Sequence, residues 1–102
     1  MNNTLEKEIE RKLKVLVEGE LGGLCLKWVC PGWSGVPDRI LLFPGGRVYF
    51  VELKRPKGGK VEALQKWWKR RLEGLGFTVW HVYSADQLKY LNLLLRDDLA
   101  RK

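Results

Sequence analysis

One stretch of the sequence, residues 35–54, constrains the fold more than any other part. It reads GVPDRILLFPGGRVYFVELK, two apolar runs separated by the Pro-Gly-Gly segment at 44–46. Apolar runs of this length around such a segment are typical of a β-hairpin. Charged residues nevertheless stand at the open end of the hairpin, with Asp38 at the start of the first run and Glu52 and Lys54 at the end of the second. The register of the hairpin therefore decides whether these charges meet.

A three-residue connection would pair Phe43 with Arg47, and the same register continues to place Asp38 directly opposite Glu52. Opposed residues of an antiparallel pair have Cβ atoms roughly 4.5–5.5 Å apart, so the two carboxylates would repel each other. A two-residue turn would instead put them on opposite faces of the sheet. Side chains alternate along a strand, so Lys54 shares the face of Glu52.

The trio of Asp38, Glu52 and Lys54 has two interpretations. In the first, Glu52 and Lys54 neutralise each other at a sheet edge while Asp38 caps the loop. In the second, the two carboxylates bind a hard divalent cation, because Mg²⁺ prefers oxygen ligands. The cation would offset their repulsion and polarise a scissile phosphate, and Lys54 would stabilise the charge that develops during phosphodiester hydrolysis. Only the second interpretation explains why both acids fall at the open end, beside a Gly-rich loop.

The remaining pattern predicts a small α/β (α+β) domain over residues 1–102, with element order αβββαβα and a mixed four-stranded sheet flanked by helices. Helices are expected over 4–18, over 61–75 and from an N-cap at Ser84, with Gln87 as its capping-box partner, to about residue 99. Strands are expected over 24–30, 38–43, 47–54 and 77–83. The second helix is expected to bury the apolar residues at helical spacing, Val61, Leu64, Trp68, Leu72 and Leu75.

The net charge of +7 favours a polyanionic partner, nucleic acid ahead of an anionic membrane surface. No apolar run is long enough to span a membrane and the charged start does not resemble a signal peptide, so we expect a cytoplasmic protein of a bacterial or phage-infected cell. Cys25 and Cys30 are expected to be reduced packing residues. The single histidine, His81, argues against a His-based metal centre, so any metal would be held by oxygens. No organic cofactor is expected.

The segment PD at 37–38 followed by ELK at 52–54 resembles the PD-(D/E)xK nuclease signature, whose superfamily has an αβββαβ, restriction-endonuclease-like core. The segments GGLCLKW, PGWSGVPDRI, GGRVYFVELK and LQKWW resemble successive blocks of the VRR-NUC family, from about residue 5 to 84. The resemblance implies an endodeoxyribonuclease that uses Mg²⁺ or Mn²⁺, with one or two ions per site. It implies that Asp38 and Glu52 bind the metal, that the Leu53 carbonyl is a further candidate ligand, and that Lys54 is catalytic.

The resemblance also implies a metal-binding glutamate on the first helix and a glutamine on the second. Glu6 matches the glutamate best, since it precedes the core residue Ile9 by three positions, and Glu10 is the second choice. Each could equally be a solvated helix acid. Gln65 falls at the edge of the apolar stripe of its helix. There its amide would contact the site, or would simply be a boundary residue bonded to the backbone.

A basic rim is expected to contact DNA phosphates without reading sequence. Its candidates are Lys27, Arg39, Arg55, Lys57 and Lys60, each of which could also be a solvated side chain. Trp33 could stack on an unpaired base or wedge into a junction, and Trp67 could form a dimer contact. Either residue could instead be a packing residue, as most tryptophans are.

Small stand-alone VRR-NUC proteins are associated with homodimers that cut branched DNA such as four-way (Holliday) junctions, in replication, recombination or repair. The resemblance therefore implies branched DNA as the substrate and a homodimer as the assembly. The alternative is a non-catalytic DNA-binding module that retains the nuclease fold. The intact set of Asp38, Glu52 and Lys54 favours the enzyme.

Overall fold

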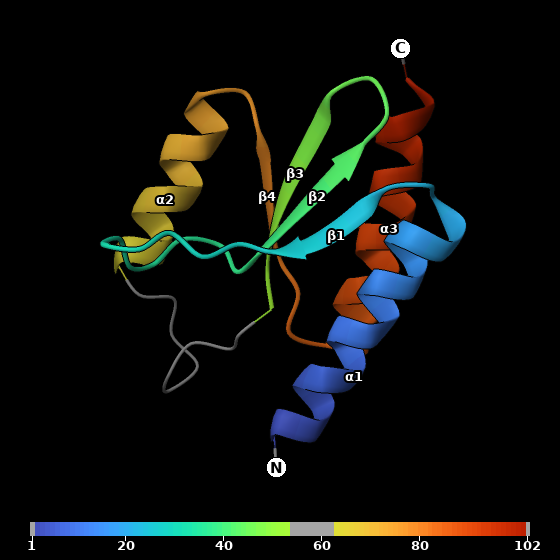
Figure 1. Cartoon of the computed structure of the whole chain (residues 1–102), viewed down its shortest axis with the longest axis horizontal. Helices are drawn as coiled ribbons and strands as arrows, with labels where there is room; N and C mark the ends of the chain where they lie inside the picture. Colours follow the sequence, from blue (N-terminus) through green and yellow to red (C-terminus); the bar gives the residue numbers. More distant parts are fainter. Residues whose placement is uncertain (1, 54–62, 102) are drawn as a thin grey trace.

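The computed structural model describes residues 2–53 and 63–101, with side chains from residue 6 onward. In chain order the elements are α1 (Asn2–Lys14), the π-helix η1 (Val15–Glu20), β1 (Leu24–Lys27), β2 (Arg39–Phe43), β3 (Arg47–Glu52), α2 (Ala63–Gly74), β4 (Thr78–His81) and α3 (Ala85–Ala100). The strands lie in the order β1, β2, β3, β4, with the first three antiparallel and β4 parallel to β3. The predicted αβββαβα order and mixed four-stranded sheet are therefore confirmed (Figure 1).

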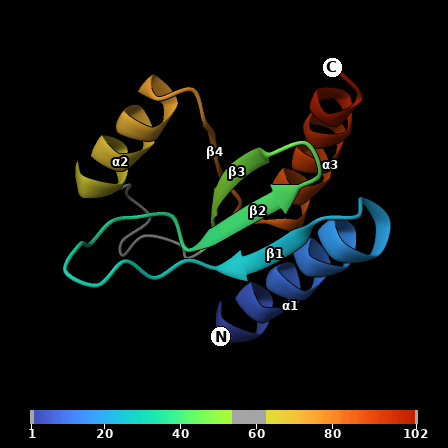
Figure 2. The ribbon, with the colours of Figure 1, turned by 45° about the horizontal axis from the view of Figure 1, so that its top comes forward.

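The sheet separates two helical layers, with α1 and α3 on one face and α2 on the other (Figures 1 and 2). The larger core fills the α1/α3 side and consists of Ile9, Leu13, Val17, Cys25, Leu41, Phe43, Tyr49, Val51, Leu53, Val82, Leu88, Leu91 and Leu95. The smaller core, under α2, consists of Phe50, Leu72 and Val79. Strand β3 therefore contributes to both faces, as the alternation of its side chains requires. Within the described residues, no helix is both long and apolar enough to cross a membrane.

The first helix runs two residues past its predicted end, through the π-helical turn η1. The Leu21 N–H donates to the Leu16 carbonyl at 3.0 Å, five residues back. Leu16 and Val17 both stay buried across this turn. A pattern of period 3.6 extends a helix but does not reveal a π-turn, which depends on hydrogen bonding rather than on residue type.

Helix α2 buries less than predicted. Leu72 is buried and Trp68 half-buried, but Leu64 and Leu75 are exposed, and Val61 lies outside the described residues. The prediction for Leu64 and Leu75 is therefore wrong. Helix α2 covers its face of the sheet alone, so only a narrow line of its side chains has anything to pack against.

The outer strands end sooner than predicted, since β1 stops at Lys27 and β4 at His81. The start of α3 matches its prediction: the Ser84 hydroxyl accepts from the Gln87 N–H at 3.2 Å. The Gln87 side chain in return accepts from the N–H of Tyr83, one residue before the cap, at 2.6 Å. Both cysteines are free thiols as expected, and burial raises the pKa of Cys25 to about 11.

Candidate active site

The hairpin has the predicted register. Its turn has three residues, 44–46, and both glycines take the left-handed backbone, with φ of 86° at Gly45 and 75° at Gly46. The strands pair from Phe43 with Arg47 to Arg39 with Val51. Continued by one residue, this register places Asp38 opposite Glu52 at the open end of the hairpin.

Asp38 joins three strands where they end. Its Oδ1 atom accepts from the Leu53 N–H at 3.0 Å, just beyond β3. Its carbonyl oxygen accepts from the Trp28 N–H after β1 and from Arg39 Nη1, each at 2.9 Å. Asp38 therefore has a structural role at the end of the sheet, where its carboxylate holds the backbone just after β3. A carboxylate has two oxygens with several acceptor sites, so this capping bond does not exclude cation binding.

Glu52 is the acid at the last position of β3 and is only 5 % exposed. It lies on the α2 face of the sheet, because Phe50 on the same face belongs to the smaller core. From α2, Gln65 Nε2 donates to Glu52 Oε2 at 3.2 Å. The structure thus brings Gln65 to Glu52, which together with Asp38 is called here the acidic pair.

Arg39 lies inside the molecule, between acids of two different elements. It is 7 % exposed, it forms an ion pair with Glu10 of α1, and its Nη1 atom lies 3.9 Å from Asp38 Oδ1. Burial lowers the pKa of Arg39, while the charges of Glu6 and Glu52 raise it. Its position suits an internal counter-charge to these carboxylates and does not suit the exposed phosphate rim in which the sequence placed it.

The three described acids of α1 differ in their partners. Glu10 forms an ion pair with Arg39, Glu8 forms one with Lys12, and the charge of Glu6 raises the pKa of Arg39. In the ranges 2–53 and 63–101, no three His, Cys, Asp or Glu side chains gather closely enough to hold a metal ion. The assignment of Glu6 or Glu10 as a metal ligand therefore stays a prediction. The carboxylates of Asp38 and Glu52 supply hard oxygen ligands of the type that Mg²⁺ and Mn²⁺ prefer, whereas Gln65 presents its amide N–H to Glu52.

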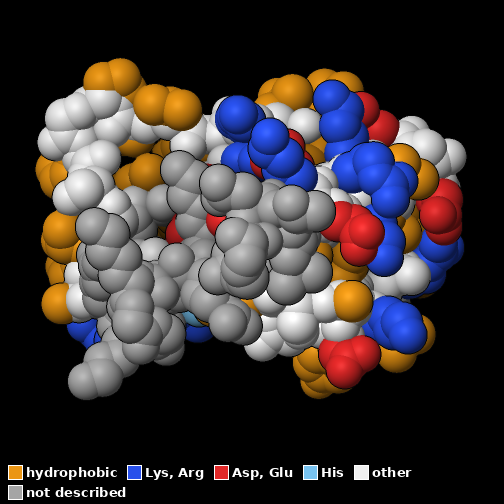
Figure 3. Space-filling view, turned by 90° about the horizontal axis from the view of Figure 1, so that it is seen from below, with side chains coloured by type: hydrophobic (Ala, Val, Ile, Leu, Met, Phe, Trp, Pro, Cys, Tyr) orange, Lys and Arg blue, Asp and Glu red, His pale blue; other side chains and the backbone are white. Residues whose placement is uncertain are grey.

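Lys27 and Trp33 are the described members of the predicted DNA-binding set that are exposed. Lys27 lines a groove of about 290 Å³ between α1 and β1, together with Lys14, Glu10 and Arg39. Trp33 lies in the loop between β1 and β2. Lys54, Arg55, Lys57 and Lys60 lie outside the described residues. Figure 3 shows acidic side chains near the middle of the face seen from below and Lys and Arg side chains toward the α1 side.

His81 is a neighbour of the acidic pair that the sequence did not reveal. In the parallel pairing of β3 and β4 it lies opposite Glu52, and its ring stacks on Tyr83 with centroids 5.7 Å apart. Burial, and then the charge of Lys69, lower the pKa of His81, while Glu73 raises it. No turn fixes the register of two strands joined through a helix, so the sequence carried no signal for this placement.

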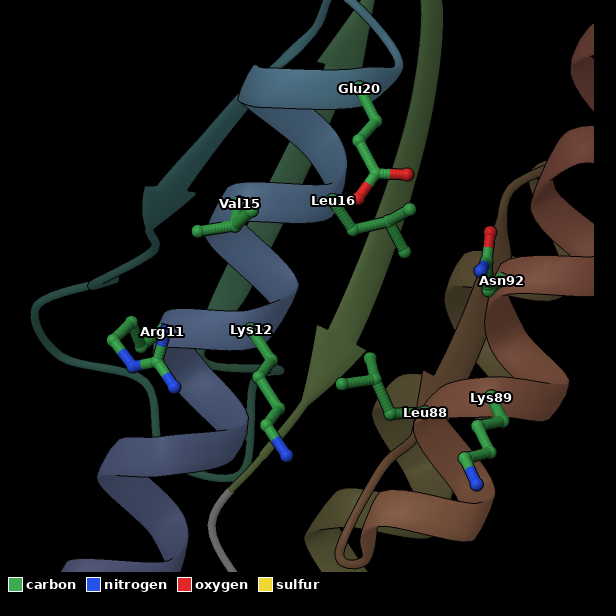
Figure 4. Close-up of a pocket in the computed structure, with 8 residues that line it drawn as sticks. All are labelled: Arg11, Lys12, Val15, Leu16, Glu20, Leu88, Lys89 and Asn92. Carbon is green, nitrogen blue, oxygen red and sulfur yellow. The ribbon is translucent and has the colours of Figure 1, made fainter.

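A second groove lies between α1 and α3, on the other side of the sheet from α2, with a volume of about 250 Å³ (Figure 4). It is lined by Arg11, Lys12, Val15, Leu16, Glu20, Leu88, Lys89 and Asn92. None of these residues belongs to the acidic pair or contacts it through a described hydrogen bond. The groove is therefore separate from the candidate active site.

The chain is similar over most of its length to one curated protein and one solved structure, although no family model matches it. It is 41 % identical over 81 residues to "Putative nuclease p44" of Acyrthosiphon pisum secondary endosymbiont phage 1, which covers 79 % of this chain and 85 % of that protein. A solved structure described as a VRR_NUC domain superposes with a TM-score of 0.74 at 32 % identity, covering 84 % of this chain and 91 % of that one. With the matching fold and the ordered motifs, these similarities show that the chain belongs to the VRR-NUC family of nucleases.

Proposed function

We propose that this protein is a metal-dependent DNA endonuclease that hydrolyses phosphodiester bonds, prefers branched DNA such as four-way junctions, and acts as a homodimer. Family membership supports nuclease chemistry in general. One observation carries the proposal for this chain: Asp38, directly before β2, lies opposite Glu52 at the end of β3, and Gln65 donates to Glu52 from α2. Arg39 offsets part of the charge of these two carboxylates from the α1 side, and a divalent cation would offset the repulsion that remains.

The residues that would hold a divalent cation are Asp38, Glu52 and the Leu53 carbonyl, with Glu6 as the acid from α1. The donor chemistry fits, because carboxylate and carbonyl oxygens are the ligands that Mg²⁺ prefers. When bound, the ion supplies Lewis-acid chemistry, in which it neutralises charge on the phosphate and makes water a stronger acid.

The protein's own groups hold the reactants in place. The Leu53 N–H fixes one oxygen of Asp38, and the Gln65 amide fixes one oxygen of Glu52, so neither carboxylate has to reorganise when the substrate arrives. Lys54 stabilises the negative charge that develops on the phosphate. Gln65 is an amide, so it orients Glu52 without adding a charge that would compete with a cation.

Electrostatics brings the DNA to this site. The net charge of +7 attracts the phosphate backbone, and Lys27, Arg55, Lys57 and Lys60 supply contacts that position it. In a homodimer, two sites related by two-fold symmetry suit paired nicks across a four-way junction. We infer the preference for branched DNA from the resemblance to the VRR-NUC family, and it can be tested directly by an assay.

The test is a cleavage panel. Labelled linear, flapped and four-way-junction DNAs are incubated with the protein in Mg²⁺, Mn²⁺ or EDTA, and the mass of the protein is measured by light scattering. We expect cleavage with either ion and none in EDTA, junction or flap cut faster than linear DNA, and the mass of a dimer. Lys54→Ala is expected to bind DNA without cutting it. Cleavage by Lys54→Ala at the wild-type rate would show that the catalytic centre is assigned wrongly.

A further inference from the structure

Four tryptophans form an aromatic cluster, called here the tryptophan cluster, between the β1–β2 loop and α2. Trp68 lies at its centre, with ring centroids 5.0 Å from Trp67, 5.7 Å from Trp33 and 6.5 Å from Trp28, all edge to face. Trp28 and Trp68 are half-buried against the smaller core. Trp33 is 61 % exposed and Trp67 is 44 % exposed. The cluster thus has a packed base and two indole rings that face solvent.

The loop that carries Trp33 is held by contacts to α2 and by a hydrogen bond within the loop itself. The indole N–H of Trp68 donates to the Ser34 carbonyl at 3.0 Å, and the Trp33 N–H donates to the Cys30 carbonyl at 3.1 Å. Gly35 has a φ of 83°, and a Cβ atom there would lie 2.6 Å from Leu64 Cβ, so the loop backbone packs directly on the helix. A ring that is held in place while exposed loses little conformational entropy when a planar ligand stacks on it.

The charges around the tryptophan cluster indicate the kind of ligand. Residues 28–37 carry no charge at all. On α2, Arg70 and Arg71 are exposed and lie three and four residues after Trp67, on the same side of the helix. An uncharged aromatic surface bordered by cations matches a nucleotide, whose flat apolar base is attached to a phosphate.

We infer that Trp33 is a stacking platform for an unpaired nucleobase of the DNA substrate. The inference rests on the proposed nuclease function and narrows its substrate to DNA with an unpaired base near the cut, as in a flap, a bulge or an opened junction. Helix α2 provides the link, because Gln65 contacts Glu52 and Trp68, three residues on, holds the loop of Trp33. A base stacked inside a duplex has no free face, so fully paired DNA gains nothing from the platform.

The experiment measures binding in EDTA, where cleavage does not occur. One duplex carries a short single-stranded tail that contains 2-aminopurine, and a second has the same sequence fully paired. We expect wild type to bind the tailed DNA more tightly and to quench its fluorescence. Trp33→Ala is expected to bind the tailed DNA about 5- to 100-fold more weakly, to lose the quenching, and to bind the paired duplex as wild type does.

Two variants make the test specific. Tyr90→Ala removes a ring that is 64 % exposed on α3, away from α2, and should change neither affinity nor quenching. Trp33→Leu keeps an apolar side chain against Trp68 but has no π-face, so it should behave like Trp33→Ala and settles the matter if the alanine variant misfolds.

A Trp33 variant that still binds the tailed DNA more tightly than the paired duplex, and still quenches the 2-aminopurine, would show that Trp33 is not the stacking platform. So would a variant with unchanged DNA binding and a reduced mass in light scattering, because the surface would then join two copies of the protein. These binding and quenching results do not depend on whether the protein cleaves DNA. Failure of wild type to cut any DNA in Mg²⁺ or Mn²⁺ would refute the nuclease proposal while the quenching assay still reported on Trp33.

Discussion

At the scale of single residues, Asp38 combines a structural and a chemical role, and isosteric substitution separates the two. Asp38→Asn keeps an Oδ1 acceptor for the Leu53 N–H but removes the charge. We expect its stability in urea unfolding to match wild type, while cleavage falls by at least about 100-fold.

Asp38→Ala is the matched control, since it loses both the charge and the hydrogen bond. It should be equally inactive and less stable by about 1 kcal/mol, because the Leu53 N–H loses its partner. An asparagine variant that cleaves as fast as wild type would mean that the carboxylate only caps the sheet.

His81 makes the stability of the fold depend on pH. Burial, more than the charge of Lys69, lowers its pKa from 6.5 in the folded protein. In acid, His81 is therefore protonated more readily in the unfolded chain than in the folded one. The free energy of unfolding then falls as the pH drops below about 6.5.

We expect His81→Gln to lose less stability than wild type between about pH 7.5 and pH 5, as measured by urea unfolding at each pH. The measured quantity is the difference between the two proteins, since other groups titrate in both. An equal loss in both proteins would assign the acid sensitivity to groups other than His81.

At the scale of elements, the sequence predicts the features that depend on neighbouring residues. It does not predict contacts between residues that are far apart in the chain. The three-residue turn sets the register, so the meeting of Asp38 and Glu52 followed from counting residues. The N-cap at Ser84 could also be predicted, because it depends only on residues close together in sequence. The pairing of β4 with β3, which brings His81 beside Glu52, depends on how α2 packs. The ion pair of Arg39 with Glu10 was also hidden, because it joins a strand to a helix 29 positions away.

The turn of the hairpin gives a prediction at this scale. Gly46 has a φ of 75°, and a Cβ there would have space but would force an L-residue into the left-handed region. Gly46→Ala should therefore destabilise the fold by about 1 kcal/mol. Gly74, at the end of α2, has equal space and no positive φ. Gly74→Ala should leave stability unchanged or raise it by up to about 1 kcal/mol, because alanine favours the helix. Equal thermal shifts in the two variants would contradict this account of the turn.

At the scale of the whole molecule, charge rather than shape governs the encounter with DNA. The net charge of +7 implies that binding releases counterions, so the logarithm of the binding constant should fall steeply and linearly with the logarithm of salt concentration. Each phosphate contact contributes close to one unit of slope.

Lys27→Ala isolates one of these contacts, because Lys27 is exposed in the groove beside Arg39 and forms no described ion pair. Anisotropy titrations in EDTA from about 50 to 200 mM salt should give a slope that is shallower by about one unit for this variant. Lys89→Ala removes an equal charge from the α1/α3 groove, on the opposite flank of α1 from Lys27, and should keep the wild-type slope. If both variants changed the slope equally, the protein would attract DNA through its overall charge alone. A slope altered only by Lys27→Ala would place the backbone of the DNA along the α1 side of the acidic pair, opposite the tryptophan cluster.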